Sequence, residues 1–335
     1  MQIRISGHNK SPNFEVSVKS VWYEFHRVFI DHGFSITNGP LYSSQIYALI
    51  ANSHSRELIK EADFYRIPLS RRILILWEPP ATIPRTYRQK ILKMYGKVFF
   101  PSEALGEEYG GDFFHWPQNV ITRPIQLINE WQNRRNKLVA IFGNKFSTQD
   151  SELYSFRRQF LHEFEDLFPK SIDLYGTEWN QSRIKNIMEV CKKILKNGFL
   201  VHKNINLFKY LGNINNYCGK CEDKLDTYRQ YKYALVIENS TQYSSEKYFD
   251  AVAGGCIVLY VGLRLQNLTF KNYDLIQCDP SSLDILKKYL KIIKMGEIEQ
   301  YNLMKDQYES AQDWSKINSH HQVLNKLANS ILQII

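Results

Sequence analysis

A group of polar side chains that follows an apolar run is the part of this sequence best suited to chemistry. Tyr233–Ile237 is typical of a buried strand and leads into Glu238–Ser240. Glu246 and Lys247 then open a helical segment. A lysine beside the N–H groups of a helix start suits a diphosphate, whereas Asn239 and Glu246 can hydrogen-bond to sugar hydroxyls. In the alternative interpretation, Glu246 only complements the helix dipole and Lys247 is a solvated surface charge.

A carboxylate earlier in the chain is suited to proton transfer. Glu78 follows the apolar run Arg72–Trp77 and precedes Pro79 and Pro80, whose rings restrict the backbone. A carboxylate held in this way can act as the general base that removes a proton from an attacking hydroxyl. Glu103 is the second candidate for this role. In the alternative interpretation, Glu78 only solvates a turn.

The elements that must position these side chains alternate between strands and helices. We expect strands at residues 72–77, 97–100, 137–144, 172–176, 233–237 and 256–260, and helices at residues 18–29, 153–168, 246–253 and 317–335. Such alternation predicts mostly parallel sheets with helices on both faces. Ligands of these sheets lie beyond the carboxyl ends of the strands. The loops after Trp77, Phe142 and Ile237 are therefore the expected places for chemistry.

Taken together, these motifs resemble glycosyltransferase family 10, the α1,3/α1,4-fucosyltransferases. The matching segments of this chain are Trp77–Pro80, Lys137–Asn144, Arg157–Phe164, Ile172–Gly176, Tyr231–Tyr233, Glu238–Ser240, Tyr243–Lys247 and Gly255–Gly262. The resemblance implies an α/β protein of the GT-B type. Such a fold has two Rossmann-like domains with a cleft between them, and a C-terminal helix that crosses back to the first domain.

The resemblance and the polar stretch Trp131–Asn136 together predict three segments. Residues 1–136 are expected to form an N-terminal acceptor-binding domain, and residues 137–305 a C-terminal domain that binds the nucleotide-sugar donor. Residues 306–335 are expected to form a C-terminal helical segment that packs back on the N-terminal domain.

The resemblance also implies an activity, the inverting transfer of fucose from GDP-fucose to a glycan hydroxyl, with Glu78 as the base. Arg157 lies at the position of the family's donor-phosphate arginine, and Arg158 is the competing candidate. An arginine fork can bind two phosphate oxygens at once, although a surface helix charge is the alternative interpretation of Arg157. The other expected donor-site residues are Asn239, Tyr243, Glu246 and Lys247. The sequence has no Asp-x-Asp motif to hold a divalent ion, so we expect neither an essential metal nor a tightly bound cofactor.

The composition limits the other classes of protein. The 335 residues carry a formal net charge of +9 and are 44% hydrophobic, which allows two α/β domains and favours an anionic partner. Lysine and arginine are spread along the chain rather than gathered in one stripe, so a nucleic-acid-binding protein is the less favoured alternative. The short spacer between Ser240 and Tyr243 leaves another GDP-, UDP- or CMP-sugar open as the donor.

Cysteine usage and hydropathy bear on the compartment. The five cysteines are scattered, which is unlike a disulfide framework, and the close pair Cys218 and Cys221 lacks the two further ligands that zinc would need. The sequence contains no apolar stretch of about 18 residues. We therefore expect a cytoplasmic protein without a transmembrane segment, and the sequence leaves peripheral membrane contact, oligomeric state and the acceptor open.

Overall fold

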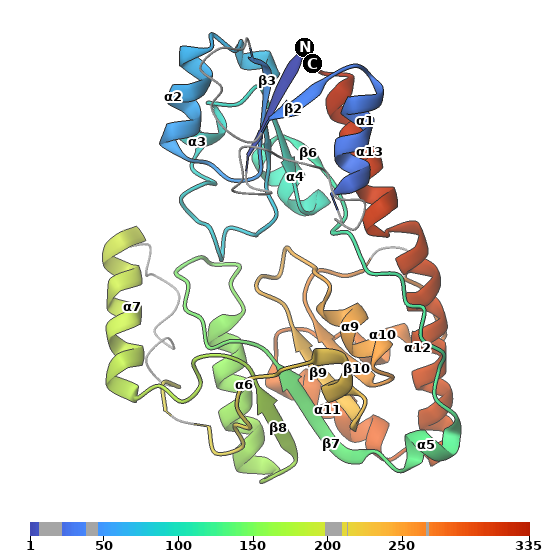
Figure 1. Ribbon diagram of the computed structural model, residues 1–335. Helices are drawn as coiled ribbons and strands as arrows, with labels where there is room; N and C mark the ends of the chain where they lie inside the picture. The colour runs from blue at the N-terminus through green and yellow to red at the C-terminus, as the bar shows by residue number, and fades with distance from the viewer. Residues whose placement is uncertain (7–21, 38–45, 198–209, 213, 266–267) are drawn as a thin grey trace. The chain divides into compact units, whose positions relative to one another are not determined.

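The computed structural model describes residues 1–6, 22–37, 46–197, 210–212, 214–265 and 268–335, and its contacts divide the chain into two compact units (Figure 1). The first unit consists of residues 1–118 and 317–335, and the second consists of residues 119–316. The domain limits predicted after residues 136 and 305 both lie within the second unit. A division of the chain by binding role stays a prediction.

The described part of the first unit contains a parallel sheet of six strands. These strands are β1 (Gln2–Ser6), β2 (Ser35–Thr37), β3 (Ile46–Ala51), β4 (Arg72–Ile75), β5 (Lys97–Phe100) and β6 (Asp112–Phe113), in the order β2-β1-β3-β4-β5-β6 across the sheet. Successive side chains of a strand point to opposite faces. Ile73 and Ile75 of β4 therefore enter one buried cluster, whereas Leu74 enters the other.

Helices cover both faces of this sheet. α1 (Tyr23–Asp31) and α13 (His320–Leu332) lie side by side over one face (Figure 1), and α2 (Arg56–Phe64), α3 (Gln89–Leu92) and α4 (Glu103–Tyr109) contribute buried side chains to the other. The apolar side of α13 joins the same cluster as Phe25 and Phe29 of α1. The segment 317–335 thus belongs to the first unit, as the GT-B expectation requires.

The described part of the second unit contains a parallel sheet of four strands. These strands are β7 (Arg135–Ile141), β8 (Ile172–Tyr175), β9 (Tyr231–Ile237) and β10 (Ile257–Val261), in the order β10-β9-β7-β8. Its helices are α5 (Ile128–Gln132), α6 (Tyr154–Leu167), α7 (Arg183–Asn197), α8 (Lys224–Tyr228), α9 (Lys247–Ala253), α10 (Tyr273–Ile276), α11 (Ser282–Ile293) and α12 (Glu297–Ile317). Two buried clusters, one on each face, show that the sheet is covered on both sides.

The structure confirms the fold class expected from the sequence, because both sheets are parallel and alternate with helices along the chain. The strands expected at residues 97–100 and 172–176 are β5 and β8, and the helix expected at residues 153–168 is α6. The strand expected at residues 72–77 ends earlier, at Ile75, and the helix expected at residues 18–29 continues to Asp31. The predicted start of that helix, at Val18, lies outside the described residues. No helix in the described part of the chain combines the length and apolar character needed to cross a membrane.

Acid should destabilise the protein through His26 of α1. This side chain is 0% exposed, and burial lowers the pKa of its imidazole from 6.5 to about 4. Between these two values the unfolded chain binds a proton that the folded chain does not, so stability falls as the pH decreases. The shift corresponds to roughly 3 kcal/mol of unfolding free energy across this window. Urea unfolding at pH 6.5 and pH 4 should therefore show a smaller loss for His26→Gln than for the wild type. His32→Gln, at an exposed position, serves as the control, and equal losses in all three proteins would contradict the prediction.

Candidate functional site

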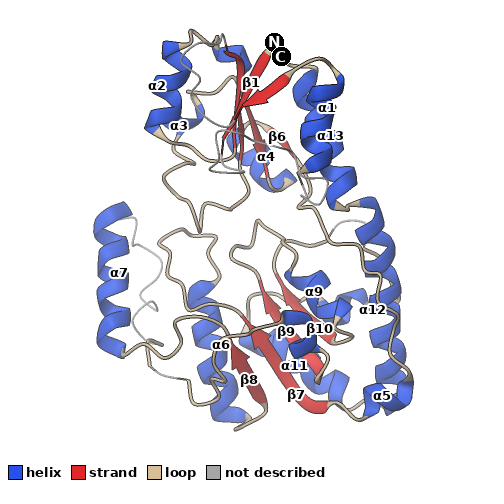
Figure 2. Cartoon of the chain, in the orientation of Figure 1, coloured by secondary structure: helices blue, strands red, loops and turns tan. Residues whose placement is uncertain are grey.

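The strand order of the second unit creates a position where ligands of parallel sheets commonly bind. The chain passes from β7 to β8 on one side of β7 and later returns as β9 on its other side (Figure 2). Ligands bind in the crevice outside the carboxyl ends of such diverging strands. The predicted loops after Phe142 and Ile237 leave β7 and β9 at this point.

A pocket of about 300 Å³ lies at these strand ends. It is lined by Ile141 at the end of β7, Phe142 and Gly143 after it, Gly176 and Thr177 after β8, Lys220, Cys221, Lys224 and Tyr228 before β9, and Lys247 and Asp250 of α9. Three of these side chains are lysines and one is a carboxylate. Gly176 has a φ of 141°, and an added Cβ would collide with the carbonyl oxygen of Phe142. The backbone turns that form this pocket therefore require glycine there.

Lys247 is fixed in this pocket by a buried carboxylate. Its Nζ lies 2.7 Å from Oε2 of Glu238 and 2.7 Å from Oγ of Ser245. Glu238 is 0% exposed and also accepts hydrogen bonds from the backbone N–H of Ser245, at 2.8 Å, and from its hydroxyl. Because β9 is buried along its length, the residue that follows it is carried directly to the sheet edge. The structure thus gives Glu238 a positioning role that sequence analysis had not assigned to it.

Lys224 and two acids of the α9 segment form a second charged group. Nζ of Lys224 lies 3.2 Å from Glu246 and 3.1 Å from Asp250. Burial alone would raise the pKa of Glu246, but Lys247 and Lys224 outweigh it and the pKa is lowered. Burial likewise opposes the charge of Lys224, but Asp250 and Glu246 outweigh it and its pKa is raised. Glu246 and Lys224 are therefore charged at neutral pH.

The expected donor-phosphate arginine is buried rather than on the surface. Arg157 is 2% exposed. Its Nε and Nη2 donate to the carbonyl oxygen of Ile237, and Nη2 also donates to Oδ1 of Asn239 at 3.0 Å. Burial lowers the pKa of Arg157, while Tyr154 is the largest opposing influence. The guanidinium thus holds the end of β9 and the side chain of Asn239, and the surface-charge interpretation of Arg157 is wrong.

The competing arginine is also buried. Arg158 is 2% exposed, and it donates to the carbonyl oxygen of Lys145 at 2.7 Å and to Oγ of Ser155 at 3.1 Å. Burial lowers the pKa of its guanidinium to about 10. Neither Arg157 nor Arg158 is among the residues that line the pocket. Phosphate binding by either arginine stays a prediction.

The other predicted donor-site residues lie near this pocket in different ways. Asn239 and Tyr243 are buried, with 9% and 2% of their surfaces exposed. Nζ of Lys247 lies 6.0 Å from the centre of the Tyr243 ring, which is a cation–π distance. The structure therefore brings Asn239 to Arg157, Tyr243 to Lys247, and Glu246 to Lys224. Lys224 lines the same pocket and was not among the site residues expected from the sequence.

The candidate base lies in the first unit, on the loop after β4. Glu78 is partly buried, and Pro79 and Pro80 behind it are buried. The hydroxyl of Tyr87 donates to the backbone oxygen of Glu78 at 3.0 Å. This hydrogen bond connects two parts of the same loop and restricts the backbone at Glu78. Burial, with Tyr109 and Glu78 adding to it, raises the pKa of Tyr87, which keeps this phenol protonated as a donor.

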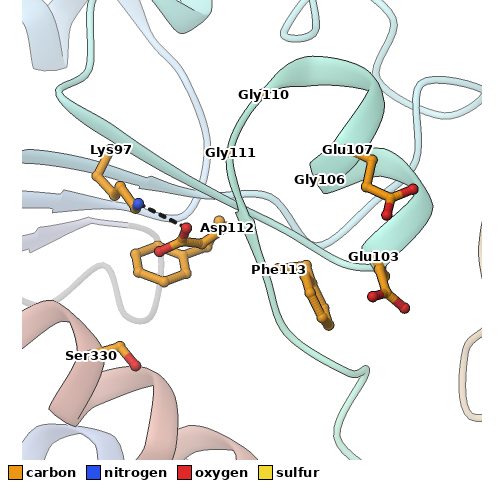
Figure 3. A pocket seen from close by; sticks show the side chains of 10 residues that line it. Lys97, Glu103, Gly106, Glu107, Gly110, Gly111, Asp112, Phe113 and Ser330 are labelled. Atoms are coloured by element: carbon orange, nitrogen blue, oxygen red, sulfur yellow. Dashed lines mark ion pairs between the residues drawn. The ribbon is translucent and has the colours of Figure 1, made fainter.

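The second candidate base lies after the neighbouring strand. Glu103 begins α4 and lines a pocket of about 580 Å³ in the first unit (Figure 3). Glu107, one turn later, projects from the same helix, and Lys97 pairs with Asp112 at 2.8 Å. Glu78 is not among the residues that line this pocket. The two candidate bases therefore occupy different surroundings, and their catalytic roles stay predictions.

Comparison with known proteins identifies the fold of the chain but no family to which it belongs. No protein-family model matches the chain, and no curated protein matches it in sequence. Several solved structures are similar in fold. A trehalose-6-phosphate protein from E. coli, bound with UDP-2-fluoro glucose, is 10% identical over 100% of both chains, with a TM-score of 0.56. A glycosyltransferase from Rickettsia africae ESF-5 is 10% identical over 99% of this chain and 98% of its own, with a TM-score of 0.53.

A third structure, an α,α-trehalose-phosphate synthase (UDP-forming) from Burkholderia vietnamiensis, is 8% identical over 85% of this chain and 71% of its own, with a TM-score of 0.51. Identities this low establish the fold alone. The chain has the fold of the GT-B glycosyltransferases, built from two Rossmann-like α/β units.

Proposed function

We propose that this protein is a glycosyltransferase that takes its sugar from a nucleotide sugar. The observation that carries the proposal is the lysine-bearing pocket at the carboxyl ends of β7, β8 and β9. Its position is the one that parallel sheets use for nucleotides. Lys220, Lys224 and Lys247 supply ammonium donors for a diphosphate, with Lys224 and Lys247 held in place by carboxylates. The GT-B fold of the chain supports the same conclusion. α9 has only seven residues, so the proposal relies on these side chains rather than on the start of that helix.

We further propose that the donor is GDP-fucose. The support is the similarity of Glu238–Ser240, Tyr243–Lys247 and Gly255–Gly262 to the signature of the α1,3/α1,4-fucosyltransferases. A UDP-sugar is the second candidate, because one structure of similar fold is bound with UDP-2-fluoro glucose. The two donors share the diphosphate and differ in base and sugar, so the lysine pocket suits both.

The proposed reaction needs one base and one group of cations. The acceptor oxygen forms a bond to the anomeric carbon of the sugar from the face opposite the nucleotide, while the bond from that carbon to the phosphate oxygen breaks. The electron pair leaves with the nucleoside diphosphate, whose growing negative charge Lys247 and the neighbouring lysines stabilise. Glu78 accepts the proton of the attacking hydroxyl. The configuration of the sugar is therefore inverted.

Two further side chains complete this proposal. Arg157 orients Asn239 by the hydrogen bond to Oδ1, so that the amide can bind a donor group. Glu246, kept ionised by Lys247 and Lys224, can accept hydrogen bonds from sugar hydroxyls. In the absence of an Asp-x-Asp motif, we expect turnover to persist in the presence of EDTA.

Calorimetric titration of the full chain with GDP, UDP and CMP, followed by turnover with the matching sugar nucleotides, tests the proposal. We expect GDP to bind most tightly and GDP-fucose to be consumed fastest. Preferential binding of UDP would transfer the assignment to the second candidate donor. If none of the three nucleotides bound, the assignment as a nucleotide-sugar transferase would fall.

A further inference from the structure

A second pocket, in the first unit, is lined by positive charge. It has a volume of about 330 Å³ and lies between the start of α2 and the loop that leads from β4 to α3. Four of the residues that line it are cationic, namely Arg56, Arg85, Arg88 and Lys90. None of the described residues that line it is acidic. We call it the anion pocket.

Like charges gathered around one cavity repel one another unless an anion lies between them. Within the described part of the chain, no ion pair engages Arg56, Arg88 or Lys90. The pKa of Glu57, the nearest acid along the chain, is lowered mainly by its own backbone N–H and Ser55 at the helix start, and less by Lys60 and Arg56. Glu57 does not line the pocket. The charges of Arg56, Arg88 and Lys90 are therefore not neutralised by an ion pair within the described residues.

The chemistry of the lining favours a phosphate. Arginine presents a planar fork that binds two oxygens of a phosphate at once, and three of the four cations are arginines. Thr86 adds a hydroxyl, and the start of α2 contributes the positive end of a helix dipole. The volume falls in the range of pockets that hold small molecules, so there is room for a phosphate together with part of the group that carries it.

The anion pocket shares a loop with the candidate base. Glu78 and Thr86 lie in the same segment between β4 and α3. In this segment the Tyr87 hydroxyl donates a hydrogen bond to the Glu78 backbone oxygen at 3.0 Å. The backbone N–H of Thr82 also bonds to the oxygen of Pro79 at 2.9 Å. A ligand held by Arg88 and the hydroxyl of Thr86 therefore lies on the segment that carries the proposed general base.

We infer that the anion pocket binds a phosphate group of the acceptor, so that the acceptor is a phosphorylated sugar or glycan. The inference rests on the proposed function for the role of the ligand as acceptor. A concave site lined by arginine forks fits a single phosphate group of a small molecule better than it fits the flat surface of a membrane. A membrane surface is therefore the competing source of phosphate, and the experiment separates the two.

Equilibrium dialysis of the full chain against radiolabelled inorganic phosphate tests the inference. The variant is Arg56→Gln/Arg88→Gln, which removes two exposed charges from the pocket. Lys287→Gln/Lys326→Gln removes two exposed charges elsewhere and is the matched control. Lys220→Gln/Lys224→Gln reports phosphate bound at the lysine pocket of the second unit. We expect the first variant to lose about tenfold or more of its phosphate affinity at one site, and the other two to keep that site.

Competition identifies the source of the phosphate. Galactose 6-phosphate, but not galactose, should displace labelled phosphate from the wild type and the control, and vesicles of phosphatidylcholine with phosphatidylglycerol should not. Unchanged phosphate binding in Arg56→Gln/Arg88→Gln would overturn the inference, as would displacement by the vesicles alone. GDP titration of the same proteins keeps the proposed function separate. We expect unchanged GDP affinity in Arg56→Gln/Arg88→Gln. If the wild type bound no GDP, the proposed function would be wrong, but the effect of Arg56→Gln/Arg88→Gln on phosphate affinity would still stand.

Discussion

Replacing Glu78 with glutamine should lower the turnover rate by roughly a hundred- to ten-thousand-fold, because a positioned general base contributes about that much to rate. The amide has nearly the same shape as the carboxylate and cannot accept the proton. The Glu78 backbone, tied to Tyr87 through its carbonyl oxygen, is untouched by the change. Initial rates with a saturating donor, together with calorimetric titration of the nucleotide, measure the effect. Nucleotide affinity should remain that of the wild type.

Glu103→Gln is the matched control for this experiment. Glu103 also follows a strand of the first sheet, but it lines a different pocket from the surroundings of Glu78. We expect this variant to turn over normally. Wild-type turnover by Glu78→Gln with a collapse in Glu103→Gln would assign the proton transfer to the second candidate.

Lys247→Met should weaken nucleotide binding about tenfold to a hundredfold, the effect of removing a charge-assisted contact. It should also reduce the free energy of unfolding by about 3 kcal/mol, because it leaves Glu238 buried without its cation. Glu238 is 0% exposed and lies 2.7 Å from Nζ of Lys247. Calorimetry measures the first effect and urea unfolding the second. Lys287→Met, at an exposed position of α11, should change neither.

A double variant separates the two effects of this substitution. Glu238→Gln/Lys247→Met removes the charge of both partners, so the stability lost in the single variant should be largely regained. Nucleotide affinity should stay low, because the ammonium group is still missing. If affinity returned together with stability, Lys247 would be a support of the fold rather than a ligand of the donor.

The strands near the proposed donor site could be predicted because each is a run of apolar residues. Tyr233–Ile237 and Cys256–Tyr260 were expected and became parts of β9 and β10 with shifts of one or two residues. β2 and β6 have three and two residues, which is too short for a periodic pattern. The order of the strands could not be predicted either, because it depends on contacts between segments far apart in the sequence.

Burial of the charged residues could not be predicted from their spacing. Neighbouring positions on a helix point about 100° apart, so Arg157 and Arg158 cannot both face the sheet. Both are nevertheless buried, because Arg158 packs over the ring of Phe146, at 4.2 Å, on the loop that follows β7. Lys224 reaches the pocket through a similar long-range contact, with Asp250 and Glu246 of the α9 segment. Such contacts leave no local signal in the sequence.

The return of residues 317–335 to the first unit has a consequence for synthesis on the ribosome. The first residues of the chain emerge early, but the cluster around Phe25 and Phe29 is completed only by Leu324, Leu327 and Ile331 of α13. Until those side chains arrive, an apolar surface of the nascent first unit stays uncovered. The second unit, contiguous in sequence, can therefore complete its core before α13 closes the cluster of the first unit.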